Sequence, residues 1–152
     1  MDVRDTIQFG LNATFTRALR CVEDVSDAEA RHTPSNLSPI IWQWGHITLS
    51  DGGFLRLAGG TSPAPEAFKG FFRTGSGGAA DYPSLADVKT VAETAQRDLL
   101  QLALAGELSR PVESRNFATI GEMLTFAAYH RGYHVGKMTT LRALLGKPRL
   151  FG

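Results

Sequence analysis

Four segments of this chain repeat apolar residues every three or four positions, which is the period of one face of an amphipathic α-helix. Helices are expected over residues 2–25, 38–58, 84–106 and 119–145. Ser84 with Asp87 and Thr119 with Glu122 have the spacing of N-terminal caps, and Pro39 suits the first helical position. No segment alternates apolar and polar residues as a half-buried strand does. The pattern predicts an all-α protein built as a four-helix bundle.

The longest link between these helices, residues 59–83, is rich in Gly and Pro and has no helical period. It nevertheless contains the aromatic residues Phe68, Phe71, Phe72 and Tyr82. Links of this length are usually functional or disordered. The aromatic residues predict that part of the link packs, either over the end of the bundle or against a partner chain. Its length also favours a parallel arrangement of the second and third long helices.

Composition bounds the class of protein. A chain of 152 residues can bury one core without a disulfide or a structural metal, and we expect a single domain over 1–152. Its 16 Lys plus Arg and 15 Asp plus Glu give a net charge of +1 without a basic run, which disfavours nucleic acid and anionic membranes as partners. The start lacks the features of a signal peptide, and no stretch of about 18 apolar residues is present, so a cytoplasmic location is expected. The single cysteine, Cys21, is expected in the core.

Two histidines, His130 and His134, lie four residues apart on the last expected helix, so that both imidazoles project from one face. Met123, Ala127 and Leu141 lie on or beside the same stripe, which places the pair toward the core. A buried polar group without a hydrogen bond costs about 1–3 kcal/mol, so two such groups imply a ligand, a network or a metal. Two histidines that share a face by chance are the alternative.

Neighbouring residues on this helix carry further expectations. Gly132 and Gly136 each weaken a helix by about 0.5–1 kcal/mol relative to Ala, which predicts that another group approaches closely there. Arg131 is expected to point to solvent or across an interface. His32, in the link before the second long helix, is expected to be exposed and without a role.

The second long helix contributes one more histidine, His46, inside an otherwise apolar half-helix. A lone histidine on an apolar face is more often a core residue with satisfied hydrogen bonds. In a bundle, however, one inward histidine can complete a metal site with a pair on a neighbouring helix. Three neutral imidazoles would leave coordination positions open on a divalent ion.

Two motifs carry a resemblance to a known family. They are Trp42-x-x-Gly45-His46 and the pair His130-x-x-x-His134 followed by x-Gly-x-x-x-x-Leu-x-x-Leu-Leu-Gly. Over nearly the whole chain, this pattern resembles the DinB superfamily, which includes the YfiT-like proteins described as metal-dependent hydrolases. The resemblance implies an up-down-down-up bundle, commonly a homodimer, in which His46, His130 and His134 hold a divalent metal. Zn or Ni is expected, with Fe or Mn as further candidates.

The resemblance also implies a class of chemistry. Characterised relatives are similar to mycothiol- and bacillithiol-dependent transferases and to maleylpyruvate isomerase, in which a metal and a small thiol act on an electrophile. A divalent ion held by neutral imidazoles keeps its charge and lowers the pKa of a bound thiol or water. The partners expected are therefore a low-molecular-weight thiol and a small-molecule electrophile. Metal-dependent hydrolysis and a non-catalytic binding bundle are the alternatives. Arg131 stands where a His-Glu-x-x-His protease has its Glu, so peptide hydrolysis by that route is not expected.

Four polar residues are candidates for contact with the cofactor or substrate. Lys137 occupies a position where many relatives have Gln, and its cation is suited to an anionic substrate. Gln43 and Ser50 flank His46 and are placed to orient a ligand or to hydrogen-bond the backbone. Tyr133 is placed either to donate to a substrate or simply to pack.

Overall fold

Residues 2–34, 36–78 and 81–151 are described by the computed structural model, and their regular structure is helical. The helices are α1 (Val3–Val22), α2 (Asp27–Arg31), α3 (Ile40–Leu57), α4 (Phe68–Phe72), α5 (Leu85–Ala105) and α6 (Ile120–Leu144). Within the described residues, β-type pairing is limited to an isolated bridge between Pro111 and Thr119. The prediction of an all-α protein is confirmed. No helix in these ranges is long and apolar enough to cross a membrane.

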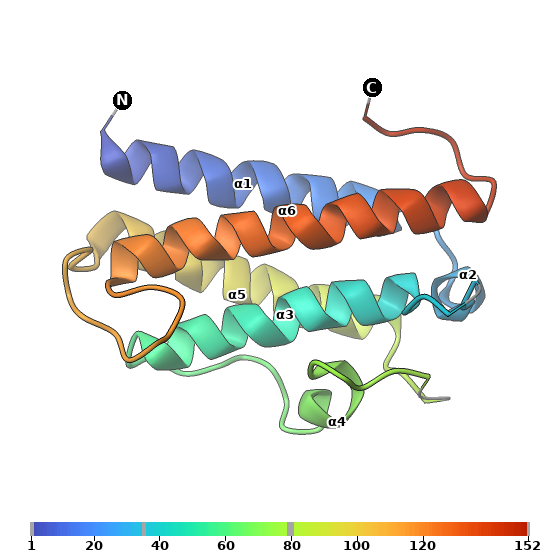
Figure 1. The fold of residues 1–152 in the computed structure, drawn as a ribbon, viewed down its shortest axis with the longest axis horizontal. Helices are drawn as coiled ribbons and strands as arrows, with labels where there is room; N and C mark the ends of the chain where they lie inside the picture. The colour runs from blue at the N-terminus through green and yellow to red at the C-terminus, as the bar shows by residue number, and fades with distance from the viewer. Residues whose placement is uncertain (1, 35, 79–80, 152) are drawn as a thin grey trace.

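The four long helices form the bundle, and each packs mainly against two others. α1 contacts α5 and α6, and α3 contacts the same two helices from the opposite corner. In Figure 1, α1 and α6 run from left to right, whereas α3 and α5 run from right to left. The neighbours α3 and α6 are therefore antiparallel, and they are the two helices that carry the candidate metal ligands.

The helix ends follow the capping chemistry, with two corrections to the expected boundaries. Ser84 and Thr119 cap α5 and α6 as predicted, each accepting a hydrogen bond from a backbone N–H of the first turn. α1 ends at Val22 rather than near residue 25, because the chain turns there to enter the short helix α2. α3 begins at Ile40, with Pro39 as its N-cap in an extended conformation rather than at the first helical position.

The aromatic link packs along the side of α3, as Figure 1 shows for α4, rather than over the end of the bundle. Phe68, Phe72 and Tyr82 are buried in the core of this chain. The Phe72 ring lies so close to α3 that a Cβ on Gly45 would stand 2.2 Å from it. The link therefore encloses the first half of α3, and its aromatic residues give no argument for a partner chain.

Candidate metal centre

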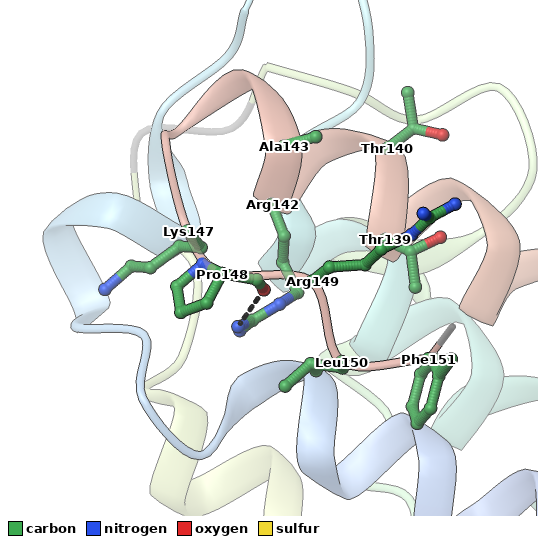
Figure 2. A pocket seen from close by; sticks show the side chains of 9 residues that line it. All are labelled: Thr139, Thr140, Arg142, Ala143, Lys147, Pro148, Arg149, Leu150 and Phe151. Atoms are coloured by element: carbon green, nitrogen blue, oxygen red, sulfur yellow. Dashed lines mark hydrogen bonds between the residues drawn. The ribbon is translucent and has the colours of Figure 1, made fainter.

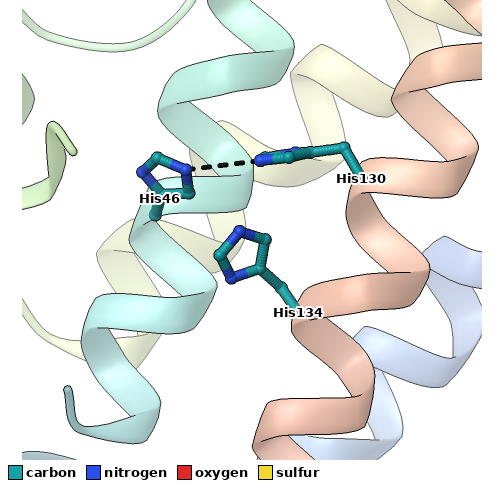
Figure 3. A group of neighbouring side chains, drawn as sticks. All are labelled: His46, His130 and His134. Carbon is teal, nitrogen blue, oxygen red and sulfur yellow. Dashed lines mark hydrogen bonds between the residues drawn. The ribbon is translucent and has the colours of Figure 1, made fainter. Parts of the chain in front are cut away.

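Three histidines from two helices converge at the contact between α3 and α6. His46 comes from α3, His130 and His134 come from successive turns of α6, and one ring nitrogen of each lies within 4.8 Å of those of the others. Figure 3 shows the three rings facing one another across the helix contact. The Nε2 atoms of His46 and His130 are 3.3 Å apart. The predicted grouping of these residues is therefore present in the fold.

The His46 ring is held from behind by the aromatic link. Its Nδ1 lies 2.7 Å from the carbonyl oxygen of Phe72. A carbonyl only accepts, so Nδ1 carries the proton and Nε2 keeps its lone pair, directed at the other two histidines. Trp42 stacks on the same ring, with centroids 4.7 Å apart and planes 8° from parallel. Sequence reasoning missed the Phe72 carbonyl, because no local pattern indicates which backbone atom meets a distant helix.

The His134 ring is oriented in the same way by Gln43. The Gln43 side-chain oxygen lies 2.7 Å from Nδ1 of His134, while its amide nitrogen donates to the Ser38 carbonyl at 3.2 Å. The second hydrogen bond determines the orientation of the amide, so His134 donates through Nδ1 and its Nε2 lone pair is free. This is the arrangement by which proteins orient histidine ligands of metals.

His130 is the least constrained of the three. Its Nδ1 is buried without a hydrogen-bond partner in the described part of the chain. The ring lies between Phe126, nearly parallel at 6.3 Å, and the edge of Phe54 at 6.3 Å. The cluster thus contains two imidazoles with converging lone pairs and a third that can supply at most one N–H to them. Such a set lacks donors and fits a divalent cation.

The protonation states of the three histidines also favour the binding of a divalent cation. Burial, together with the neighbouring imidazoles, lowers the pKa of His130 to about 4 and that of His134 to about 3. Burial also lowers the pKa of His46, against the hydrogen bond to Phe72. All three rings are therefore neutral near pH 7, which is the form that binds metal.

The expectation that Arg131 points to solvent or across an interface is wrong. Its side chain is 0% exposed and pairs with Asp51, which is 1% exposed, at 2.9 Å. The burial of Asp51 raises the pKa of its carboxyl group, and Arg131 opposes this effect. The helical spacing does indicate that Arg131 is buried. It lies four residues after Ala127 and seven before Met138, in the buried stripe of α6. Sequence reasoning did not single out Asp51.

One side of the triad opens into a cavity of about 620 Å³. Its lining residues are His46, Ser50, Gly53, Phe54, Arg56, Leu57, Thr74, Asn116, Phe126 and His130. This volume lies within the range of small-molecule sites. The structure places Ser50 in this cavity, and Arg56, Thr74 and Asn116 are polar lining residues that sequence reasoning did not identify.

Lys137 and Tyr133 do not line this cavity. Both are exposed, and the Lys137 ammonium group sits over the Tyr133 ring at 4.5 Å. Lys137 and Gln43 line a separate cavity of about 310 Å³, on the Gln43 side of His134. The Tyr133 ring meets the His134 ring edge-on at 5.1 Å. The structure thus brings Gln43 into contact with the triad but places Lys137 outside the triad's cavity.

The expected close approach at Gly132 and Gly136 is also wrong. Among the described residues, a Cβ on Gly136 would meet nothing within 4 Å, and one on Gly132 would meet only Thr14, at 3.9 Å. Both glycines face outward, so helix packing does not require them. Cys21 is buried and His32 is exposed, as expected.

A comparison with known families agrees with these motifs. The model of the family described as the DinB superfamily matches residues 11–138, a range that contains all three histidines. No curated protein matches the chain. Because the family match covers far more than half of the sequence, this chain belongs to the DinB superfamily.

Proposed function

We propose that this protein is a metal-dependent transferase that joins a low-molecular-weight thiol, of the bacillithiol or mycothiol type, to an electrophilic small molecule. One observation carries the proposal: three neutral imidazoles converge closely enough to share one ion, and two of them, His46 and His130, line a small-molecule-sized cavity. Membership of the DinB superfamily supports it. A metal with open positions toward a cavity is typical of catalytic rather than structural sites.

Some residues of the site would hold the metal ion, and others would orient the histidines that hold it. His46, His130 and His134 would hold the ion. Gln43 and the Phe72 carbonyl would keep two of the rings in the ligating tautomer. Bound in this way, a divalent ion would supply a positive charge that makes a thiol more acidic and a better nucleophile near neutral pH.

The composition of the cavity favours a thiol over water as the nucleophile. No Asp or Glu is among its lining residues, so the described part of the site offers no carboxylate as a general base. A thiol has an ordinary pKa of about 8.5, and a modest decrease makes it ionise without such a base. Water is far less acidic and gains more from a base. Metal-dependent hydrolysis is therefore the second candidate.

The same lining suggests the kind of electrophile. Phe54, Leu57 and Phe126 provide apolar and aromatic walls, and Arg56 is the charged residue among the lining positions other than the histidines. Such a cavity suits a molecule with an apolar or aromatic body and an anionic group within reach of Arg56.

The test is thiol consumption by the metal-loaded protein. Purified protein is loaded with Zn²⁺ or Ni²⁺ and incubated with bacillithiol or mycothiol and aromatic electrophiles, with and without a carboxylate. Loss of thiol is expected with wild type and with His32→Ala, which removes an exposed histidine, but not with His130→Ala or after chelation. Thiol-independent cleavage of activated esters would instead support hydrolysis. A metal-loaded protein inactive in both assays would leave a non-catalytic binding role.

A further inference from the structure

Arg131 joins all four long helices at the centre of the bundle. Its Nε donates to both carboxylate oxygens of Asp51 of α3, at 3.2 and 3.1 Å, and its Nη2 lies 2.9 Å from the same carboxylate as an ion-pair contact. Its Nη1 donates to the Leu11 carbonyl of α1 at 3.1 Å and to the Gln96 side chain of α5 at 2.6 Å. It also lies 5.6 Å from the centre of the Phe15 ring of α1. A single side chain of α6 thereby contacts each of the other three long helices.

This pair lies on the same two helices as the candidate ligands. Arg131 directly follows His130 on α6, and Asp51 follows His46 by five positions on α3. Five residues correspond to roughly 7.5 Å along a helix, less than one and a half turns. Any sliding or rotation of α6 against α3 that separates His46 from His130 would also separate Asp51 from Arg131.

We propose that Asp51 and Arg131 are a positioning pair for the metal centre, which maintains the offset of α3 and α6 at which the three imidazoles converge. The inference depends on the proposed metal site, but not on the thiol chemistry. The multidentate contacts of the guanidinium group impose a direction as well as a distance, which an apolar contact between the same helices would not do.

Stability alone gives little reason for a buried ion pair. Removing two charges from water costs about as much as their attraction returns, and apolar residues of similar volume often hold a fold equally well. The pair is also neutral as a unit, so it places no net charge beside a bound cation. Arg131 without Asp51 would place an uncompensated positive charge next to His130 and oppose metal binding.

The chain contains a matched control on the same helix. Arg142, near the C-terminal end of α6, is also buried and pairs with Asp24, and it donates to the Cys21 carbonyl at 3.0 Å. Figure 2 shows Arg142 in a pocket at this end of α6, donating to the Pro148 carbonyl. Its hydrogen-bond partners belong to the end of α1, the link after it and the chain after α6, and none belongs to α3. Removing this pair disturbs α6 without acting on its offset from α3.

The experiment compares Asp51→Leu/Arg131→Met with Asp24→Asn/Arg142→Met, using Co²⁺ as the probe. Circular dichroism and melting temperature report the fold, and a Co²⁺ titration with its visible spectrum reports the affinity and geometry of the site. The expected result is that both proteins stay helical. The Asp51/Arg131 variant should bind Co²⁺ about 10- to 100-fold more weakly with an altered spectrum, in the range found when residues that orient ligands are removed. The control should bind within about twofold of wild type.

Wild-type affinity and an unchanged spectrum in a folded Asp51→Leu/Arg131→Met protein would overturn the proposal. Arg131→Lys provides a second test if the double variant does not fold, because it keeps the charge and loses the planar fork. It should weaken Co²⁺ binding with a smaller change in melting temperature, and an unchanged affinity would count against the pair. A wild type that binds Co²⁺ but consumes no thiol would refute the transferase and leave the positioning pair intact. A wild type that binds no metal would refute both.

Discussion

The Nε2 atoms of His46 and His130 lie 3.3 Å apart, although 84 positions separate the two residues in the chain. With His46 holding its proton on Nδ1, its Nε2 can only accept from His130 or bind a cation. A cation at this point could accept lone pairs from both rings, and it could also accept the Nε2 lone pair of His134.

Metal content is the most direct prediction. Protein purified without a histidine tag should carry close to one equivalent of a transition metal, measured by elemental mass spectrometry. His46→Ala and His130→Ala should each lose it, because two imidazoles hold a divalent ion much more weakly than three. His32→Ala should retain it. A wild type that stays metal-free after Zn²⁺, Ni²⁺, Fe²⁺ and Mn²⁺ are offered would make the triad a set of core histidines.

Gln43 should control metal affinity without touching the metal. Gln43→Leu removes the acceptor for Nδ1 of His134 and should weaken metal binding by about 10- to 100-fold. Gln43→Glu keeps an acceptor and should retain tight binding. Gln101→Leu, at an exposed position of α5, is the control for the same chemical change. Equal metal dissociation constants for the Gln43→Leu and Gln101→Leu proteins would show that Gln43 does not orient His134.

Gly45 should be intolerant of even a methyl group. In Gly45→Ala, the new Cβ would lie 2.2 Å from the buried Phe72 ring, so the aromatic link must shift. Overpacking of this kind typically costs about 1–3 kcal/mol, and the shift would also move the carbonyl that holds His46. Chemical denaturation should show a lower free energy of unfolding, and a metal titration should show weaker binding.

Gly136→Ala should have the opposite effect on the free energy of unfolding from Gly45→Ala. Its Cβ would meet no atom of the described part of the chain within 4 Å, and alanine is about 1 kcal/mol more favourable than glycine within a helix. This variant should therefore raise the free energy of unfolding, with little change in metal affinity. A lower free energy of unfolding for Gly136→Ala would contradict this prediction and would indicate that another group lies close to Gly136.

The metal-free protein should lose stability as the pH falls from about 6.5 toward 5. The folded pKa values of His130 and His134, about 4 and about 3, lie below the unfolded value of 6.5. In this window the unfolded chain binds more protons than the folded one, so the free energy of unfolding falls with pH, by up to about 1.4 kcal/mol per unit for each such group. The raised pKa of Asp51 acts in the opposite direction.

Urea denaturation of wild type and of a His130→Ala/His134→Ala protein at pH 7, 6 and 5 isolates the histidines. The contribution of Asp51 is common to both proteins and cancels in the comparison. The variant should show a shallower dependence on pH, and parallel curves would contradict the depressed pKa values. His32 is present in both proteins and serves as an internal constant.

Much of the site could be predicted from the sequence because the signals are local. The four-residue spacing of His130 and His134 places both rings on one face of a helix in any fold. The caps at Ser84 and Thr119 depend on residues three positions away. Glycine was harder to interpret, since Gly136 and Gly45 look alike in the sequence, and only Gly45 faces a packed ring.

By itself, the sequence determined the helices, the paired histidines of α6 and the membership of the DinB superfamily. Periodicity and spacing act within one or two turns, where backbone geometry is the same in every protein. Only the tertiary structure brought His46 to the pair, placed the Phe72 carbonyl behind it and turned Arg131 inward to Asp51. Those contacts join residues 26, 84 and 80 positions apart, and burial of apolar surface between whole helices decides which of them meet.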